Sequence, residues 1–217
     1  DVYEGDWKDD NFNGKGICIY KNGDIYEGDY KDSKFHGNGK HTGSDGAIYE
    51  GEWMNHKRNG KGNQKYENGD IYEGEWRNSK SHGKGKEIFA HGHVYEGDFK
   101  DGKPHGKGNK KFANGDVYEG EWKNGKRNGK GIYIWKGGTV YEGDSKDNNQ
   151  HGKGNTKYAN GDFYEGDFKD NKFHGKGKYI YKNGDVYEGE WRNDTEYNGR
   201  RYKLEYVSFE GKKFKPC

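Results

Sequence analysis

The sequence has few of the aliphatic residues from which most protein cores are built. Leu, Ile, Val and Phe together number 26 of 217 residues (1, 9, 6 and 10), below the roughly 20% under which a chain is often disordered. Disordered chains also have a high net charge and few aromatic residues, whereas this chain has a net charge of +2 with 19 Tyr and 6 Trp. We therefore expect a folded chain that aromatic packing and cross-strand pairs stabilise.

Other absences narrow the classes of function. The 39 basic residues are balanced by 37 acidic ones, which leaves no field for non-specific binding of nucleic acid. No apolar run approaches the length of about 18 residues that spans a bilayer, and no signal-peptide pattern follows Asp1. Cys18 and Cys217 are the only cysteines and lie at opposite ends of the sequence. An intramolecular disulfide is therefore not expected, and a reducing compartment is favoured.

What the chain does have is a strict repeat of 23 residues that begins with Tyr-Glu-Gly. The copies start at Tyr3, Tyr26, Tyr49, Tyr72, Tyr95, Tyr118, Tyr141, Tyr164 and Tyr187. A period between about 20 and 50 residues is typical of arrays in which each unit packs only against its neighbours. Each repeat is numbered below from its Tyr as position zero.

Two strands and two turns fit in one repeat. Asn-Gly pairs such as Asn68-Gly69 are typical of tight hairpin turns because both residues tolerate positive φ, and they are expected to join consecutive repeats. The charged segment inside a repeat, as in residues 31–37, predicts a longer exposed loop. The fold class predicted is all-β, an elongated single-layer array of tandem antiparallel β-hairpins without helices.

Strand alternation places positions zero, two and four on one face, with the acidic residues of positions one and three on the other. Position four holds Trp7, Tyr30, Trp53, Trp76, Phe99, Trp122, Ser145, Phe168 and Trp191. Position seventeen holds Tyr20, Gly43, Tyr66, Phe89, Phe112, Trp135, Tyr158 and Tyr181, and we expect it on the same face. Its facing depends on whether the Asn-Gly turn closes with two residues or contains a glycine bulge. Glycines at positions two, eleven and thirteen are expected to leave gaps over which rings lie.

The succession Tyr-Glu-Gly-(Asp/Glu)-Trp-Lys, (His/Asn)-Gly-Lys-Gly and (Tyr/Phe)-x-Asn-Gly-Asp-(Val/Ile)-Tyr resembles the MORN repeat, the membrane occupation and recognition nexus motif. The resemblance implies a twisted, groove-shaped sheet with the aromatic residues on its concave side. It also implies non-enzymatic roles in cytoskeletal, ciliary (axonemal, radial-spoke) or membrane-proximal assemblies, where some members bind a partner helix and others self-associate through terminal repeats. We expect nine repeats over residues 1–199 and a degenerate terminal repeat with a basic tail over residues 200–217.

These features predict a non-catalytic scaffold in the cytoplasm whose groove holds a protein segment, preferably a helix. The aromatic row serves either internal packing or partner binding, and both interpretations stay open. The predicted partner-binding residues are Trp7, Tyr30, Trp53, Trp76, Phe99, Trp122, Phe168, Trp191, Tyr66, Phe89, Phe112, Trp135, Tyr158 and Tyr181. Gly43 and Ser145 interrupt the two aromatic rows and are expected to form weak points or recesses.

Three alternatives remain at the sequence level. A peripheral membrane module would contact anionic lipid through Arg200, Arg201, Lys203, Lys212, Lys213 and Lys215. A self-associating array would join copies through its ends. A small-ligand module would bind a cation between rings, although the repeat pattern is much more similar to MORN.

Catalysis and metal binding find no support in the sequence, and no cofactor is expected. Each candidate Glu, Asp, His or Lys recurs at one phase of the repeat, whereas an active site needs different groups that converge in one pocket. The histidines of position ten recur about 10 Å apart, too far to share one zinc ion, and are expected to form hydrogen bonds in turns. They are His36, His82, His105, His151 and His174. The Lys row at position twelve is expected to be balanced by the Glu row at position one.

Overall fold

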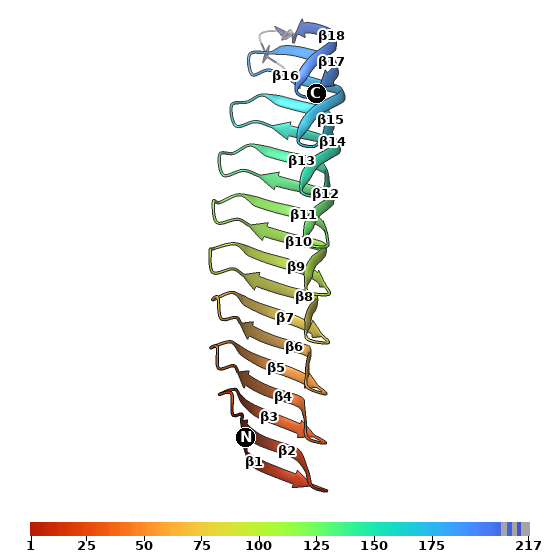
Figure 1. Cartoon of the computed structure of the whole chain (residues 1–217). Helices are drawn as coiled ribbons and strands as arrows, with labels where there is room; N and C mark the ends of the chain where they lie inside the picture. Colours follow the sequence, from red (N-terminus) through yellow and green to blue (C-terminus); the bar gives the residue numbers. More distant parts are fainter. Residues whose placement is uncertain (205–207, 210–211, 214–217) are drawn as a thin grey trace. The chain divides into compact units, whose positions relative to one another are not determined.

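The structure, a computed structural model, describes residues 1–204, 208–209 and 212–213, and these form strands and turns without a helix. The strands are β1 Val2–Lys8, β2 Asn11–Ile19, β3 Ile25–Lys31, β4 Lys34–Thr42, β5 Ile48–Met54, β6 Lys57–Lys65, β7 Ile71–Arg77, β8 Lys80–Ile88, β9 Val94–Lys100, β10 Lys103–Lys111, β11 Val117–Lys123, β12 Lys126–Ile134, β13 Val140–Lys146, β14 Asn149–Lys157, β15 Phe163–Lys169, β16 Lys172–Ile180, β17 Asp185–Arg192, β18 Thr195–Lys203, β19 Ser208–Phe209 and β20 Lys212–Lys213. Consecutive strands make antiparallel hairpins (Figure 1), which confirms the predicted all-β hairpin array.

The chain divides into two compact units. The first comprises Asp1–Asn114 and Trp122–Gly125, and the second comprises Gly115–Glu121 and Lys126–Cys217. In the first unit, β1 to β10 pair antiparallel with their neighbours in chain order. In the second unit, β12 to β18 pair in the same way. Each unit is thus a single open sheet in which every inner strand has a partner on both sides.

The turn inside each repeat is shorter than the sequence suggested. In the turn Asp32-Ser33 both residues have positive φ, 48° and 58°, and Lys31 pairs directly with Lys34. This is a two-residue turn with the handedness that suits the right-handed twist of the strands. The expectation of a longer loop over residues 31–37 was wrong, because Asp, Asn and Ser at these two positions adopt the left-handed conformation and the following charged residues belong to the next strand.

The Asn-Gly turn between repeats contains the glycine bulge. The amide of Gly23 donates to the carbonyl of Tyr20, and the amide of Tyr20 donates to the carbonyl of Asp24, both at 2.9 Å. Gly23 has a φ of 90°, whereas Asn22 does not have positive φ. A type I turn followed by a glycine in the left-handed region produces this pattern. The two-residue closure was therefore the wrong alternative, and the three-residue loop sets the facing of the second strand.

A second bulge lies inside each repeat, where the register shifts between Gly51 and Trp53. Opposite it, Gly60 at position eleven has a φ of 83°, and the carboxylate of Glu52 accepts a hydrogen bond from the amide of Lys61 at 2.8 Å. The same bond recurs in six other repeats. The carboxylate of position three therefore binds a backbone amide of its own repeat. The glycine of position eleven supplies the positive φ that the bulge requires, and it does not leave the gap for a ring that was expected.

Backbone hydrogen bonds tie each turn to the preceding repeat. The amide of Ser79, in the turn of repeat four, donates to the carbonyl of Arg58 in repeat three at 2.9 Å. At the opposite ends of the strands, in the turns between repeats, the carboxylate of Asp70 accepts the amide of Ala90 at 2.8 Å. These bonds connect consecutive hairpins at both ends of their strands, so side chains at equivalent positions form files.

Candidate functional site: the aromatic face

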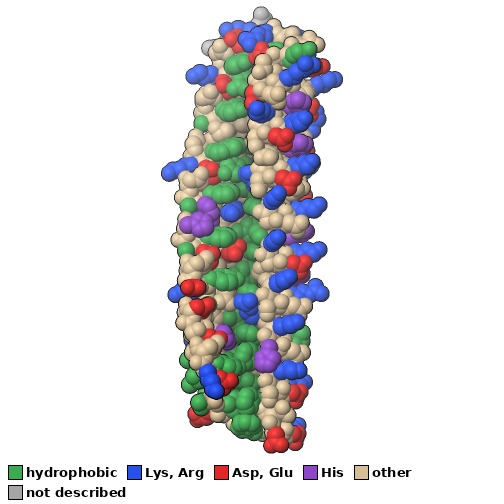
Figure 2. Space-filling view, viewed as in Figure 1, with side chains coloured by type: hydrophobic (Ala, Val, Ile, Leu, Met, Phe, Trp, Pro, Cys, Tyr) green, Lys and Arg blue, Asp and Glu red, His purple; other side chains and the backbone are tan. Residues whose placement is uncertain are grey.

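We call the side chains at positions zero, four, nine, fifteen and seventeen of the repeats the aromatic face. Hydrophobic side chains gather there in a file flanked by charged and polar side chains (Figure 2). The face contains both the core of each unit and the half-buried side chains that cover it, so burial separates packing residues from contact residues.

Position zero is the interior of the face. The inner tyrosines are almost fully buried, for example Tyr26 at 0% and Tyr72 at 1% exposure. The Tyr49 ring covers Gly62 at position thirteen so closely that a Cβ there would collide with the Tyr49 hydroxyl. The hydroxyl donates to the carbonyl of Glu52 at 3.0 Å. The prediction that aromatic rings lie over strand glycines is thus confirmed at position thirteen. The Tyr of the Tyr-Glu-Gly triplet therefore has a packing role.

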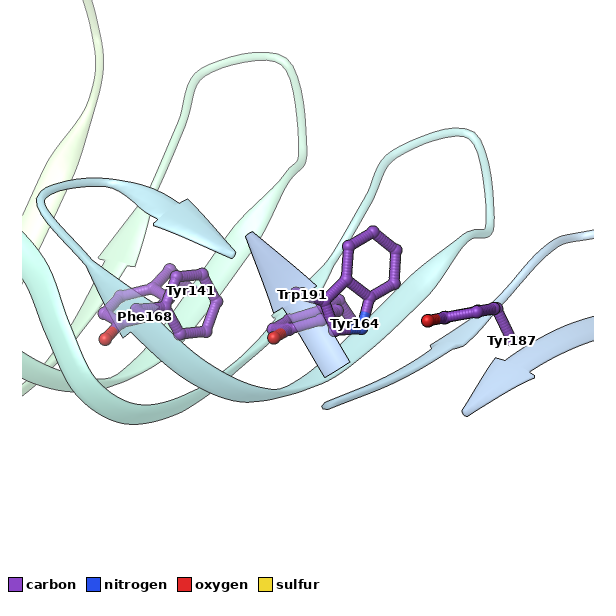
Figure 3. Packing of buried hydrophobic residues seen from close by; sticks show 5 residues of the cluster. All are labelled: Tyr141, Tyr164, Phe168, Tyr187 and Trp191. Carbon is purple, nitrogen blue, oxygen red and sulfur yellow. The ribbon is translucent and has the colours of Figure 1, made fainter. Parts of the chain in front are cut away.

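Position four fills the space between consecutive tyrosines. Trp53 meets Tyr49 and Tyr26 edge to face, with ring centroids 4.9 and 5.5 Å apart, and its Nε1 donates to the carbonyl of Gly39 at 3.0 Å. In the second unit Trp191 lies against Tyr164 at 5.5 Å in the same geometry (Figure 3). Such edge-to-face contacts add about 0.5–1.5 kcal/mol each to the burial of the rings.

Most of the predicted contact residues at position four are therefore interior. The exposed fractions are Tyr30 4%, Trp53 8%, Trp76 4%, Phe99 4%, Trp122 5%, Phe168 4% and Trp191 4%. Trp7, in the first repeat, is 60% exposed. Any partner on this face touches at most the edges of the buried rings, so their truncation would measure packing more than binding.

Position seventeen lies on the aromatic face and is accessible. The half-buried rings there are Tyr20, Tyr66, Phe89, Phe112, Trp135, Tyr158 and Tyr181. Trp135 contacts Tyr133 with centroids 4.6 Å apart, and the Tyr181 hydroxyl donates to Glu196 at 3.0 Å. The facing predicted for this position is confirmed, because the glycine bulge of the preceding section keeps positions fifteen and seventeen on the side of the Tyr ring.

Positions nine and fifteen were missed at the sequence level. Position nine holds Phe12, Phe35, Arg58, Ser81, Pro104, Arg127, Gln150, Phe173 and Glu196, and position fifteen holds Cys18, His41, Gln64, Glu87, Lys110, Tyr133, Thr156, Tyr179 and Tyr202. Phe35 stacks on Tyr26 with centroids 3.6 Å apart, and position fifteen pairs across the strands with Tyr of position zero, as His41 does with Tyr26. The sequence signal that could have revealed these two positions is their change of residue type from repeat to repeat, because the other positions of this face change little.

Charged groups are partly buried among the rings. The guanidinium of Arg58 lies 4.4 Å from the ring centroid of Trp76 and donates to Gln64 at 2.6 Å, and burial lowers its pKa. The ammonium of Lys110 lies over Phe89 and Phe112 at 5.4 and 5.2 Å. Burial raises the pKa of Glu87, and the negative charge of Asp70 raises it further. The positive charge of Lys110 offsets part of this increase. Cations over rings in a partly desolvated site give this face directional polar contacts.

The rows of His and Lys are structural. His105 accepts the amide of Asn124 at 3.5 Å, as the turn role predicts. The Nδ1 atoms of His36, His82 and His174 are buried without a hydrogen-bond partner, and that of His151 lies 3.5 Å from the carboxylate of Asp170. Lys15 and Lys84 pair with Asp29 and Asp98 at 2.6 Å. In these pairs the acid that balances the Lys row is position three of the next repeat, where the Glu row of position one was expected to balance it. The described residues contain no group of three side chains placed to hold a metal ion.

Three residues of the basic end, within the part of the chain that the structure describes, pair with acidic residues of the same chain. Arg200 pairs with Glu188 at 3.1 Å, Arg201 with Glu196 at 2.6 Å and Lys203 with Asp185 at 3.6 Å. The side chains of Lys212 and Lys213 are not described, and Lys215 and Cys217 lie outside the described residues. Cys18 is buried with a free thiol. The residues that the structure describes include no helix that could span a lipid bilayer.

Stacked hairpins with a repeated Tyr-over-Gly core define the class of β-hairpin repeat proteins. The family model of the MORN repeat matches residues 3–25, 26–48, 49–71, 72–94, 95–117, 118–140, 141–163, 164–186 and 187–195, so the chain belongs to the MORN-repeat family. The resemblance seen in the sequence is confirmed. No match was found among curated protein sequences.

Solved structures are similar to the chain at low sequence identity. The G-box domain of the microcephaly protein CPAP is 13% identical, with a TM-score of 0.53 over 89% of this chain and 100% of that chain. The TCP domain of SAS-4 (dCPAP) from Drosophila melanogaster, solved with a proline-rich motif of Ana2, is 15% identical with a TM-score of 0.43, over 72% and 85% of the two chains. The TCP10 domain of Danio rerio CPAP is 13% identical with a TM-score of 0.44, over 79% and 86%. The G-box likeness supports the fold, and neither it nor the family model indicates an enzyme family.

Proposed function

We propose that the chain is a non-catalytic interaction module that holds a segment of a partner protein on its aromatic face. The observation that carries this proposal is the file of half-buried rings at position seventeen, interleaved with polar side chains that differ between repeats at positions nine and fifteen. Apolar surface in such a file favours a linear ligand. Arg58, Glu87 and Lys110 give it a polarity that a particular segment can match.

The spacing of the file suits a helix. Strands lie about 4.8 Å apart, so equivalent residues of adjacent repeats lie about 10 Å apart. Side chains seven residues apart on one face of an α-helix are separated by about 10.5 Å. One partner residue in every heptad would then reach each repeat. We propose a cytoskeletal, ciliary or membrane-proximal assembly as the setting, on the strength of the family resemblance alone.

Photo-crosslinking from two neighbouring positions tests this proposal. Phe89 is half-buried on the aromatic face, whereas the adjacent Ile88 is 39% exposed on the opposite face. A photo-reactive phenylalanine at position 89 is expected to capture a protein in native extract, and the same group at position 88 is the matched control. Equal capture from both positions, or none from position 89, would contradict the proposal.

The crosslinks also report the conformation of the segment. Photo-reactive groups at Tyr66 and Phe89 occupy the same position of adjacent repeats in the first unit. A bound helix would be labelled at residues about seven apart, whereas an extended segment would be labelled about three apart. Mass spectrometry of the crosslinked peptides distinguishes the two spacings, and a spacing of three would replace the helix with an extended strand.

A further inference from the structure

Repeat seven is the repeat that has no aromatic ring at position four, and it has none at positions nine and fifteen either. Position four is Ser145, position nine is Gln150 and position fifteen is Thr156. In the next repeat Phe168 and Phe173 occupy positions four and nine, and their rings pack on Tyr164 with centroids 5.1 and 3.7 Å away. The missing ring at position four, with no ring at positions nine and fifteen to fill its place, therefore leaves a gap, and the rings of repeat eight close the file on the C-terminal side of that gap.

The gap is a recess of about 580 Å³ in the second unit. Its wall includes Arg127, Tyr133, Trp135, Tyr141, Ser145 and Thr156. This volume lies within the range of about 300–1,000 Å³ that small-ligand sites occupy. The recess is thus large enough for a bulky side chain, and five of its lining residues contribute an aromatic ring or a guanidinium.

One buried polar atom at the recess, the hydroxyl oxygen of Thr156, indicates that the recess binds a ligand. Thr156 is 3% exposed, and its Oγ1 has no hydrogen-bond partner. Gln64, the buried polar residue at the same position of repeat three, is satisfied by the carbonyls of Ile48 and Lys65 at 3.1 and 2.8 Å and by Arg58. An unpaired buried hydroxyl is costly. A ligand that donates a hydrogen bond to Thr156 would remove that cost.

The other repeats show which ligand fits. Trp53, Trp76 and Trp122 each place an indole at position four, and each Nε1 donates to the carbonyl of a position-thirteen glycine at 3.0 Å. Ser145 supplies no indole, so an indole that enters the recess from a ligand has its single N–H donor available for Thr156, which lines the recess. The guanidinium of Arg127, which lies 4.7 Å from the ring centroid of Tyr133, stands at the wall of the recess where it can contact a further ring.

We propose that the recess at Ser145 receives a tryptophan side chain from the segment bound on the aromatic face, whose indole completes the interrupted file. This inference rests on the proposed function, because it assigns the ring to the bound partner. It makes repeat seven the anchor point that fixes the register of the segment. Alanine in place of the partner tryptophan is expected to weaken binding at least tenfold, because rings buried in pockets are typical binding hot spots.

N-acetyl-L-tryptophanamide, which presents the side chain without charged ends, is the probe. Titrated at millimolar concentration into the whole chain with labelled Thr methyl groups, it is expected to shift the NMR signal of the Thr156 methyl saturably. N-acetyl-L-leucinamide is the control and is expected to leave this signal unchanged. Equal shifts by both compounds, or none by the tryptophan compound, would overturn the inference.

Two variants close the recess from different sides. Ser145→Trp restores the residue common at position four, and Gln150→Phe restores the ring that repeats one, two and eight carry at position nine. Both are expected to abolish the probe-induced shift, and a probe that still shifts Thr156 in either folded variant counts against the site. If photo-crosslinking at Phe89 captures a protein while the probe leaves Thr156 unmoved, the recess inference fails and the proposed function stands. If the probe binds and photo-crosslinking at Phe89 captures nothing, the proposed function fails. The claim that the indole belongs to a bound partner segment then fails as well.

Discussion

At the scale of single residues, the repeat depends on a tyrosine that covers a glycine. In repeat eight the Tyr164 ring, 0% exposed, lies on Gly177, and its hydroxyl donates to the carbonyl of Asp167 at 2.9 Å. Gly166 faces Gly177 across the strands. Two glycines side by side allow the ring to lie flat on the backbone, which replaces an aliphatic core with aromatic-on-peptide packing.

Gly177→Ala is expected to destabilise the chain by about 1–3 kcal/mol, because the new methyl would collide with the Tyr164 ring and hydroxyl. Gly137→Ala is the matched control, since no heavy atom lies within 4 Å of a Cβ there, and it should change the free energy of unfolding by less than about 0.5 kcal/mol. Urea unfolding followed by tyrosine and tryptophan fluorescence measures both. Equal effects of the two substitutions would contradict the ring-over-glycine account.

Acid is expected to destabilise the array through Asp98, an acidic residue of position three. Burial opposes ionisation of Asp98, but hydrogen bonds from Lys84 and the amide of Lys107 outweigh it and lower its pKa. A carboxyl whose pKa is lower in the folded state stabilises the fold above its unfolded pKa of about 3.9, and that stability is lost as pH falls through the folded value. Asp98→Asn should therefore flatten the loss of stability below about pH 4.

Urea midpoints at a series of pH values check this prediction. Asp101→Asn is the control, because Asp101 lies in the two-residue turn with a φ of 50°, which Asn adopts readily. The control should keep the pH dependence of the original chain. An Asp98→Asn variant with the unchanged slope below pH 4 would show that the bulge carboxylate does not set the acid stability.

At the scale of the strand and turn, two turns of different geometry alternate along the chain. Gly102, in a two-residue turn, has a φ of 84° with no atom within 4 Å of a Cβ, so only the backbone conformation opposes a side chain there. Gly102→Ala should cost about 1–2 kcal/mol. Gly137→Ala again serves as control because Gly137 does not have positive φ. Matching losses of thermal stability in the two variants would exclude a backbone origin.

The strands and the aromatic face could be predicted from the sequence because a period of two puts position zero and position four on the same side. The turns could not be assigned with the same success. Asn-Gly suits both a two-residue turn and a type I turn with a bulge, and Asp32-Ser33 gives a weaker signal for positive φ than Asn-Gly does. Arg58 and Thr156 were missed for another reason. They lie on either side of the second bulge in their strands, Arg58 before it and Thr156 after it, and the hydrogen bond that the amide of Lys61 or Lys153 donates in this bulge is not revealed by composition.

At the scale of the whole molecule, stability is expected to depend on contacts between neighbouring repeats. The core of each unit is a file of rings along the aromatic face, in which a buried ring such as Trp53 packs on rings of its own and the preceding repeat. In such arrays the free energy is close to a sum of repeat and interface contributions. Damage to one interface should therefore allow the repeats on one side of it to open separately.

Trp53→Ala should remove about 3–5 kcal/mol, because the ring is 8% exposed and donates to Gly39. Hydrogen exchange should then show β1 to β4 losing protection together, while β5 to β10 keep theirs. Trp7→Ala is the matched control, since Trp7 is 60% exposed in this chain, and faster exchange should be confined to β1 and β2. Uniform loss of protection across the first unit after Trp53→Ala would mean that the unit unfolds as one cooperative block, and that its repeats cannot be treated as separable binding segments.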